Sequence, residues 1–325
     1  THDLAVVAGI ADRVAVMQKG IIVEEGPTEE LFRNHSHPYT RQLFAASKHQ
    51  PRLVLQPAQP RPLLRVEGVV REYPLPRASA FARPETFRAV DEVSFHIDQG
   101  ESVGLIGESG SGKSTLTRAI LGLDPLQGGR ITLDGQEIRA GRGLSPELRA
   151  RMQVVFQDPF GSFDPRWRVD RLVAEPFHLT GLPRDWRDQV AEVLYDVGIT
   201  GDVMSRYIHE FSGGQRQRIA IARALIIKPR LIVLDEAVSA LDVRVRAQIL
   251  DLLVQLRVRH GLAYLFISHD LTVVRQITDR VLILEKGRIV ESGPTHQILE
   301  TPENPYTQRL VAASPRIPEA WTAHE

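Results

Sequence analysis

The sequence predicts an α/β fold with a parallel central sheet, and three observations lead to this prediction. The runs 103–107, 231–236 and 262–268 are almost continuously apolar, as are parallel strands covered on both faces. Helix-like stretches separate these runs along the chain, which is typical of α/β proteins. A glycine-rich loop and a helix-like stretch directly follow the first run.

Two further segments are predicted to be strands. Residues 64–67 and 89–97 alternate between apolar and polar side chains, a pattern with the two-residue period of a strand. The segment from Pro74 to Glu85 between them is rich in proline, arginine and alanine, so we predict that it is a loop insertion.

An internal repeat predicts the domain organisation. Residues 1–28 reappear at 268–295, with His2 matching His269, and the same offset pairs 38–40 with 305–307. No gap is needed, and roughly half of the aligned residues are identical. Two copies of one tail imply two copies of the body that precedes it.

We therefore interpret residues 1–50 as the C-terminal end of a first domain whose body is absent from this sequence. A free-standing piece of this size would bury too little apolar surface to be stable. A proline-rich linker is predicted at 51–62, a complete second domain at 63–315 and a C-terminal tail at 316–325.

Composition excludes several classes of protein. The 325 residues include 40 Lys+Arg and 40 Asp+Glu, so the charges balance, which argues against a nucleic-acid-coating protein. The sequence contains no cysteine, which rules out disulfides, thiolate metal sites and cysteine nucleophiles within it. No stretch reaches the roughly 18 apolar residues of a membrane span.

A phosphate-binding loop is the strongest chemical signal. The stretch 107–114 fits G-x-x-x-x-G-K-[ST] between a strand and a helix, where backbone N–H groups converge on phosphate oxygens. Lys113 would contact the terminal phosphates, and the Ser114 hydroxyl would bind Mg²⁺. The predicted nucleotide-binding residues here are Gly107, Glu108, Ser109, Gly110, Ser111, Gly112, Lys113, Ser114 and Thr115.

Two adjacent carboxylates follow the apolar run that begins at Leu231. We expect Asp235 to lie near the metal and Glu236 near the attacking water. Glu236 would act as general base, a role that contributes about 10²–10⁴-fold in rate. Adjacent acids are common at strand ends, so this prediction depends on the phosphate loop.

Three more motifs complete the pattern. Phe211 is followed by Ser212, Gly213, Gly214 and Gln215 at the start of a helix-like run, where Ser212 is a good N-cap. Gln157 follows an apolar strand, and His269 follows the apolar run at 262–268. In this order the motifs resemble those of the ATP-binding domains of ABC transporters, over essentially all of residues 63–315.

The resemblance implies an ABC-type P-loop domain with a parallel sheet core, antiparallel strands and a helical subdomain at about 159–227. Two such domains would pair head to tail, so Ser212–Gln215 would contact the nucleotide held by the partner domain, which here is the truncated first domain. Gln157 would sense the γ-phosphate and metal, His269 would hold the γ-phosphate, and Asp242 would organise the domain contact.

The base of ATP would stack on an aromatic side chain upstream of the phosphate loop. We favour Tyr73 for this contact, and Phe87 is the alternative. Catalysis would then depend on Glu236, His269, Lys113 and Gln157, with Ser114, Gln157 and Asp235 at the metal.

The segments 156–166 and 293–310 resemble ATPase subunits of dipeptide, oligopeptide and nickel importers. This similarity implies an ATPase that powers peptide uptake, peripheral to the cytoplasmic face of the membrane, with permease subunits and, indirectly, an extracytoplasmic peptide-binding protein as partners. Phe160, Phe163 and Trp167 would line the groove for a permease helix or be ordinary core.

The alternative is an ABC ATPase that acts on ribosomes or DNA. Ribosomal members have a longer, highly charged linker, whereas 51–62 is short and rich in proline. DNA-acting members need a coiled coil or zinc module, and neither heptads nor cysteines occur. The cargo itself is left open between dipeptides, longer peptides, nickel and other small solutes.

Overall fold

The computed structural model describes residues 1, 3–48, 51, 59–75, 85–140, 144–158 and 160–321. A central sheet has the order β12-β11-β5-β10-β9-β8, and its neighbours are parallel except for β11 and β12. This arrangement confirms the predicted α/β class. The strands are β5 (Ser102–Ile106), β8 (Met152–Val155), β9 (Leu231–Asp235), β10 (Ala263–Ile267), β11 (Arg280–Glu285) and β12 (Arg288–Pro294).

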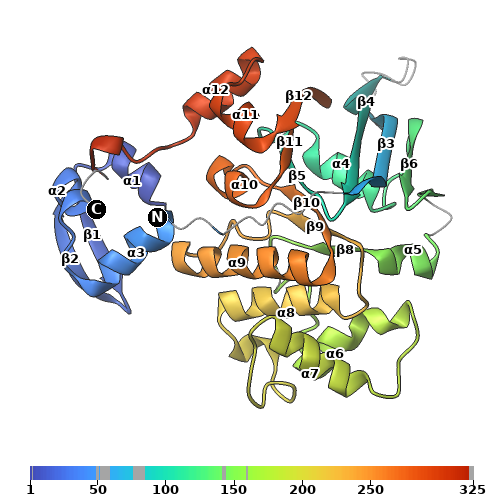
Figure 1. Cartoon of the computed structure of the whole chain (residues 1–325), viewed down its shortest axis with the longest axis horizontal. Helices are drawn as coiled ribbons and strands as arrows, with labels where there is room; N and C mark the ends of the chain where they lie inside the picture. Colours follow the sequence, from blue (N-terminus) through green and yellow to red (C-terminus); the bar gives the residue numbers. More distant parts are fainter. Residues whose placement is uncertain are drawn as a thin grey trace.

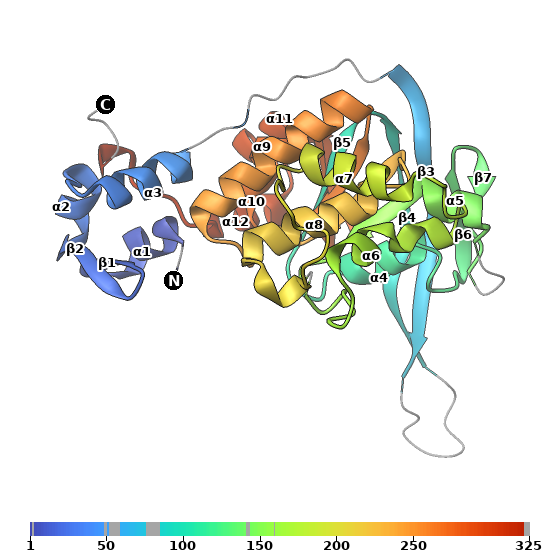
Figure 2. The same cartoon turned by 90° about the horizontal axis from the view of Figure 1, so that it is seen from below.

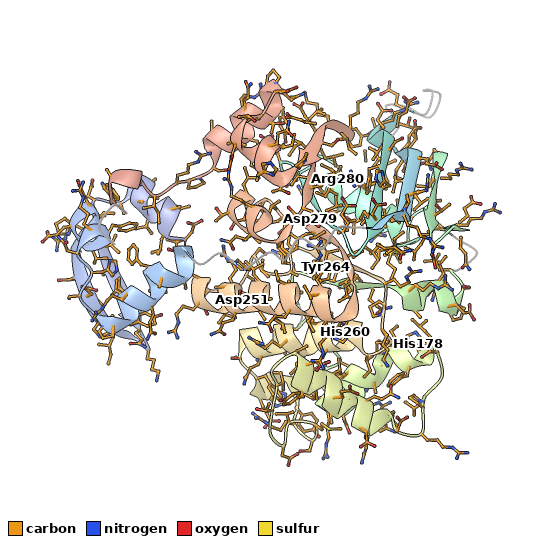
Figure 3. All side chains as sticks on the ribbon, viewed as in Figure 1. His178, Asp251, His260, Tyr264, Asp279 and Arg280 are labelled. Carbon is orange, nitrogen blue, oxygen red and sulfur yellow. The ribbon has the colours of Figure 1, made fainter. Side chains whose placement is uncertain are left out.

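Both faces of the central sheet are buried, which explains its continuous apolar sequences. In β10, Tyr264 and Phe266 belong to the core on one face, while Ala263, Leu265 and Ile267 belong to the core on the other. The buried Tyr264 hydroxyl donates a hydrogen bond to the Leu253 carbonyl oxygen at 2.9 Å. Figure 3 labels this tyrosine among the strands, together with Asp279 and Arg280 near the start of β11.

An antiparallel sheet covers one side of the phosphate-loop helix. Its order is β4-β3-β6-β7, and the helix contributes Leu116 and Ile120 to the core that the sheets share. The elements are β3 (Gln59–Pro74), β4 (Thr86–Gln99), β6 (Gly128–Leu133), β7 (Gln136–Glu137), α4 (Lys113–Ile120) and, before β8, α5 (Pro146–Arg151).

Two sequence predictions concern the hairpin that β3 and β4 form. Strand β3 begins at Gln59, so residues 59–62 at the end of the predicted linker are in a strand, which is a correction. Prolines at the start of a strand are tolerated because one edge there needs no N–H donor. Most of the predicted loop insertion after Pro74 lies outside the described residues.

Helices cover the face of the central sheet to which Tyr264 and Phe266 belong. In Figure 1, α9 lies next to the sheet, α8 next to α9, and α6 and α7 farther out. The elements are α6 (Val169–Ala174), η1 (Glu175–His178), α7 (Trp186–Asp196), η2 (Ile208–Glu210), α8 (Gly213–Leu225), α9 (Val243–His260), α10 (Leu271–Ile277), α11 (Thr295–Glu300) and α12 (Pro305–Ala313).

The N-terminal unit repeats the end of the larger one. Its elements are α1 (Leu4–Ile10), β1 (Arg13–Gln18), β2 (Ile21–Pro27), α2 (Thr28–Arg33) and α3 (Pro38–Lys48). The first four have the bounds of α10, β11, β12 and α11 shifted by one constant offset, and a bulge after Val16 matches one after Ile283. His2, the counterpart of His269, lies outside the described residues.

The C-terminal tail joins the two units. Its short helix η3 (Glu319–Trp321) lies over the N-terminal unit in Figures 1 and 2. Ile317 and Trp321 pack against a small core that contains Phe32 and Phe44. Helix α3 also packs against α9, so the N-terminal unit contacts the larger unit through a helix and through the tail.

Candidate active site

The phosphate loop connects the end of β5 to the start of α4. Gly112 ends the loop with φ +108°, a left-handed conformation that favours glycine. A Cβ atom at Gly112 would lie 2.3 Å from the Ala89 carbonyl oxygen, so the loop and β4 approach too closely for any side chain. The Gly287 N–H, in the turn between β11 and β12, donates a hydrogen bond to the Ser111 carbonyl oxygen at 2.8 Å and holds the loop in place.

Lys113 is held against its own loop. Its ammonium donates to the carbonyl oxygens of Gly107 at 2.7 Å and Glu108 at 2.9 Å, and the residue is 8% exposed. Burial lowers the pKa of Lys113, and the carboxylates of Glu236 and Asp235 oppose this shift. The ammonium is therefore poorly hydrated, which strengthens its attraction for phosphate, and the two nearby carboxylates favour its charged form.

Across from the loop, Glu236 and His269 form a pair. His269 Nδ1 lies 3.1 Å from Glu236 Oε1. Glu236 has φ +49°, a strained value for a residue with a side chain, and its N–H donates to the Ile267 carbonyl at 3.0 Å. Burial and the neighbouring Glu236 raise the pKa of Asp235, whereas Lys113 lowers it.

One open pocket of about 490 Å³ unites most of these groups. It contains loop residues, the Glu236–His269 pair and the two aromatic candidates for the base contact. Its lining residues are Tyr73, Phe87, Ala89, Ser109, Gly110, Gly112, Lys113, Ser114, Thr115, Glu236 and His269. Ala89 was not predicted to belong to the site, because no local sequence pattern identifies an alanine whose carbonyl group approaches a distant loop.

The two aromatic candidates are cross-strand partners in β3 and β4. Tyr73 is held in place, because its hydroxyl donates to Asp124 Oδ2 at 3.1 Å and the Arg71 guanidinium lies 4.3 Å from its ring centroid. Phe87 is 54% exposed. Both rings line the pocket, and the contacts of Tyr73 fix the position of its ring.

Other predicted site residues lie elsewhere among the described residues. Gln157 is exposed, two positions beyond the end of β8, and does not line the pocket. The predicted signature occupies the N-terminus of α8, where Ser212 and Gln215 form a capping box, and Asp242 caps α9. The residues predicted for the site but absent from the pocket lining are Gly107, Glu108, Ser111, Gln157, Ser212, Gly213, Gly214, Gln215, Asp235 and Asp242.

The oxygen donors near Lys113 fit a magnesium ion that is shared with phosphates. Ser114 offers an exposed hydroxyl in the pocket, and Asp235 offers a half-buried carboxylate that interacts with Lys113. Mg²⁺ in nucleotide sites commonly takes one or two protein oxygens and completes its shell with phosphates and water. Among the described residues, no group of three or more His, Cys, Asp or Glu side chains forms a metal cage.

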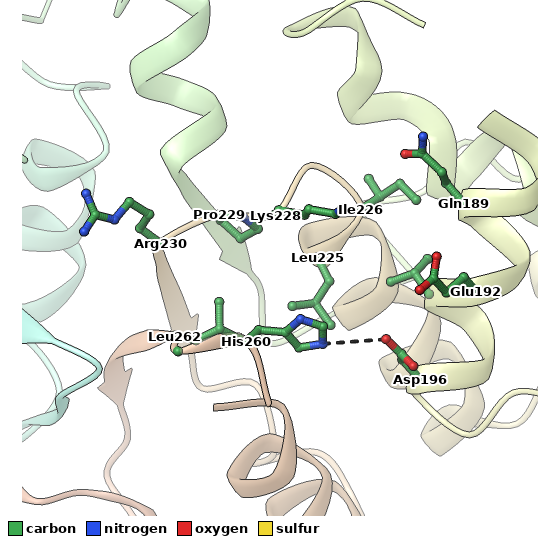
Figure 4. A pocket seen from close by; sticks show the side chains of 12 residues that line it. Gln189, Glu192, Asp196, Leu225, Ile226, Lys228, Pro229, Arg230, His260 and Leu262 are labelled. Atoms are coloured by element: carbon green, nitrogen blue, oxygen red, sulfur yellow. Dashed lines mark ion pairs between the residues drawn. The ribbon is translucent and has the colours of Figure 1, made fainter. Parts of the chain in front are cut away.

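Two other pockets are separate from this chemistry. The first, of about 320 Å³, contains the ion pair between His260 and Asp196 at 3.6 Å and no residue of the phosphate loop (Figure 4). The second, of about 490 Å³, is lined by Phe156 and Trp167. Of the two alternatives for Phe163, the structure supports ordinary core, because the side chain is 6% exposed and packs in the core under the Arg223 guanidinium.

A contact from the C-terminal region was not expected. The Tyr306 hydroxyl accepts a hydrogen bond from the Glu108 N–H at 3.0 Å, so α12 touches the phosphate loop. The only sequence signal is the repeated Pro-Tyr-Thr motif, which by itself predicts no partner.

Comparison with known proteins gives two family matches. Residues 90–239 match the ABC transporter family, and residues 23–59 and 290–325 match the C-terminal region of oligopeptide/dipeptide transporters. The second match covers the later part of both copies of the repeat. Among the described helices, none has the length and apolar character needed to span a bilayer.

Relatives and solved structures agree with these matches. The glutathione import ATP-binding proteins GsiA of Escherichia coli K12 and of Salmonella paratyphi A are each 44% identical over 97% of the chain and 55% of their own length. The chain thus spans about half the length of these relatives. CbiO1 of Clostridium perfringens, part of the ABC transporter complex cbiONQ, is 28% identical with a TM-score of 0.65, over 75% of this chain and 92% of that one. The ATP-binding cassette MJ0796, in a dimeric post-hydrolysis state with ADP and Pi, is 27% identical with a TM-score of 0.61, over 71% and 98%.

Proposed function

Because the chain belongs to the ABC transporter family, we propose that it binds and hydrolyses ATP to power the import of peptides through a membrane permease. The observation that carries this proposal is the single pocket that unites Lys113 with the Glu236–His269 pair. A phosphate-binding cation on one wall and a base on the other are what in-line attack on a γ-phosphate requires.

In the proposed reaction, Lys113 leaves the loop carbonyls and binds the terminal phosphates. Glu236 polarises the attacking water and accepts its proton, and His269 holds the γ-phosphate beside that water. Ser114 and Asp235 would hold Mg²⁺, which when bound would offset the charge of the β- and γ-phosphates. Tyr73 stacks on the base, with Phe87 as the alternative.

A second ATPase domain completes the site. Ser212–Gln215 lie outside the pocket of their own domain and have backbone N–H groups at an exposed helix start, so we assign them to the nucleotide of a partner domain. The dimeric state of MJ0796 supports such pairing. In this proposal Asp242 organises the contact between the domains, and Gln157 senses the γ-phosphate and the metal. The partner is the first domain, of which residues 1–50 are the end.

Peptide import is the transport role that we propose. Support comes from the match to the oligopeptide/dipeptide transporter region in both repeat copies and from relatives that are named for import of glutathione, a small peptide. The partners are permease subunits and, indirectly, an extracytoplasmic peptide-binding protein, and the chain acts at the cytoplasmic face of the membrane. These matches favour import over the alternative of action on ribosomes or DNA.

The test is the ATPase activity of the full-length protein assembled with its permease, with and without peptide-loaded binding protein. Glu236→Gln should lower turnover about 100-fold or more while ATP still binds, because the amide cannot accept the proton. Glu192→Gln, at an exposed glutamate of α7, is the matched control and should leave turnover unchanged. Persistent peptide-stimulated turnover in Glu236→Gln would assign hydrolysis to another site.

A further inference from the structure

The contact between Tyr306 and the phosphate loop joins residues 198 positions apart in the sequence. The Tyr306 hydroxyl accepts the hydrogen bond of the Glu108 N–H at 3.0 Å, and the side chain is almost fully buried. Burial raises the pKa of Tyr306, so the hydroxyl is uncharged at neutral pH, and its oxygen accepts this hydrogen bond as a neutral phenol.

The same peptide group is held at its other end by Lys113. The Glu108 N–H and the Gly107 carbonyl belong to one planar trans peptide, in which the two groups point in opposite directions. Tyr306 binds the N–H end, and the Lys113 ammonium binds the Gly107 oxygen at 2.7 Å. The orientation of this plane therefore sets where Lys113 rests at the loop.

Tyr306 is itself fixed by the start of α12. The Asn304 side chain accepts from the Tyr306 N–H at 2.8 Å, and Pro305 occupies the first helical turn. From β12, the two oxygens of the Glu291 carboxylate accept from the N–H groups of Glu303 at 2.8 Å and Asn304 at 3.3 Å. A side chain anchored in this way has little freedom to change its position relative to the phosphate loop.

We propose that Tyr306 is a positioning residue for nucleotide binding: its hydroxyl orients the Gly107–Glu108 peptide so that the loop presents Lys113 to the phosphates. This inference rests on the proposed function. It gives the C-terminal region, which matches the oligopeptide/dipeptide transporter family, an indirect role at the ATP site. Tyr306 touches neither ATP nor the reacting atoms in this role, so it acts through the loop.

The internal repeat supplies a matched control. Tyr39 stands at the same place in the repeated Pro-Tyr-Thr motif, at the start of α3. This sequence contains no phosphate loop for that copy, and the Tyr39 hydroxyl makes no hydrogen bond among the described residues. The Arg244 guanidinium of α9 lies 5.8 Å from the Tyr39 ring centroid, a contact that phenylalanine preserves.

The experiment compares Tyr306→Phe with Tyr39→Phe in the 325-residue chain. Affinities for ATP and for AMP, which lacks the outer phosphates, are measured by calorimetry, and exchange of the Glu108 amide is measured by NMR or mass spectrometry. Tyr306→Phe leaves that amide without an acceptor, so we expect ATP binding to weaken about five- to tenfold. AMP binding should change little, and Glu108 exchange should accelerate about tenfold.

Several results would overturn the proposal. Unchanged ATP affinity in Tyr306→Phe would do so. Equal weakening of ATP binding in Tyr39→Phe would also do so. Equal loss of ATP and AMP binding in Tyr306→Phe would indicate a general loss of stability and would likewise contradict the proposal. Glu291→Gln, which loosens the start of α12, should give a smaller shift in the same direction. If the wild-type chain binds no ATP, the proposed function fails, and Glu108 exchange still tests the contact.

Discussion

At the scale of single residues, the backbone of the phosphate loop is determined by what surrounds it. Gly112 must be glycine for two separate reasons, its φ of +108° and the Ala89 carbonyl oxygen 2.3 Å from any added Cβ. Gly110 has φ +81° but open space around the position of a Cβ. Substitutions at these two glycines therefore distinguish the cost of a left-handed backbone, which applies at both, from the cost of steric overlap, which applies only at Gly112.

Gly112→Ala should destabilise the protein by several kcal/mol and abolish ATP binding, because β4 must move to relieve the clash. Gly110→Ala should cost only about 1–2 kcal/mol of left-handed strain. Urea unfolding and ATP titration of both variants check this expectation. Equal destabilisation by the two substitutions would show that β4 moves without cost.

At the scale of elements, strand pairing brings distant side chains to one edge of the nucleotide pocket. The register of β3 and β4 sets Tyr73 opposite Phe87. Tyr73 is held by Asp124 and covered on one face by Arg71, so its ring loses little freedom when a base stacks on it. Among the residues that the structure describes, none supports the mostly exposed Phe87 in a comparable way.

Tyr73→Ala should therefore weaken ATP binding about tenfold, since base–aromatic stacking contributes about 1–3 kcal/mol per base. Phe87→Ala should change the affinity less than twofold. Both variants are titrated with ATP and with inorganic triphosphate, which has no base and should bind them alike. The reverse order of effects would assign the base contact to Phe87.

At the scale of the whole molecule, the tail after α12 connects two cores. Trp321 packs edge-on against Phe32, with ring centroids 5.6 Å apart, and Phe32 in turn contacts Phe44 at 4.7 Å. In the other repeat copy, Leu299 and Val311 stand where these two phenylalanines occur. The N-terminal unit thus has a small aromatic core that the far end of the chain completes.

Trp321→Ala should destabilise the N-terminal unit by about 2 kcal/mol, less than the ~3–5 kcal/mol of a fully buried aromatic, because Trp321 is only half-buried. Hydrogen exchange should accelerate in α2 and α3 and stay unchanged in β5 and β10. Trp186→Ala, in the helical core around α7, is the control and should affect α7 and α8 instead. Unchanged exchange in α2 would contradict this role of the tail.

Much of the fold and of the nucleotide site follows from local sequence. Continuous apolar runs predicted the strands of the central sheet, because both faces of this sheet are covered. The phosphate-loop pattern predicted that Lys113 and Ser114 line a pocket, because phosphate binding by such a loop depends on residues adjacent in the sequence. Gln157 and Ser212–Gln215 were predicted for the same chemistry through a resemblance. Ser212–Gln215 lie outside the pocket, as the proposed site shared with a second domain requires, whereas Gln157 was expected at the metal and does not line the pocket.

The sequence by itself determined the α/β class, the repeat and the phosphate loop, since each depends on residues within a short stretch or on direct self-similarity. Only the tertiary structure decided that Tyr306 holds the loop, that Ala89 forces a glycine at 112 and that Trp321 completes the N-terminal core. These contacts join residues roughly 25 to 300 positions apart. Packing sets such distances, and no local pattern encodes which residues it brings together.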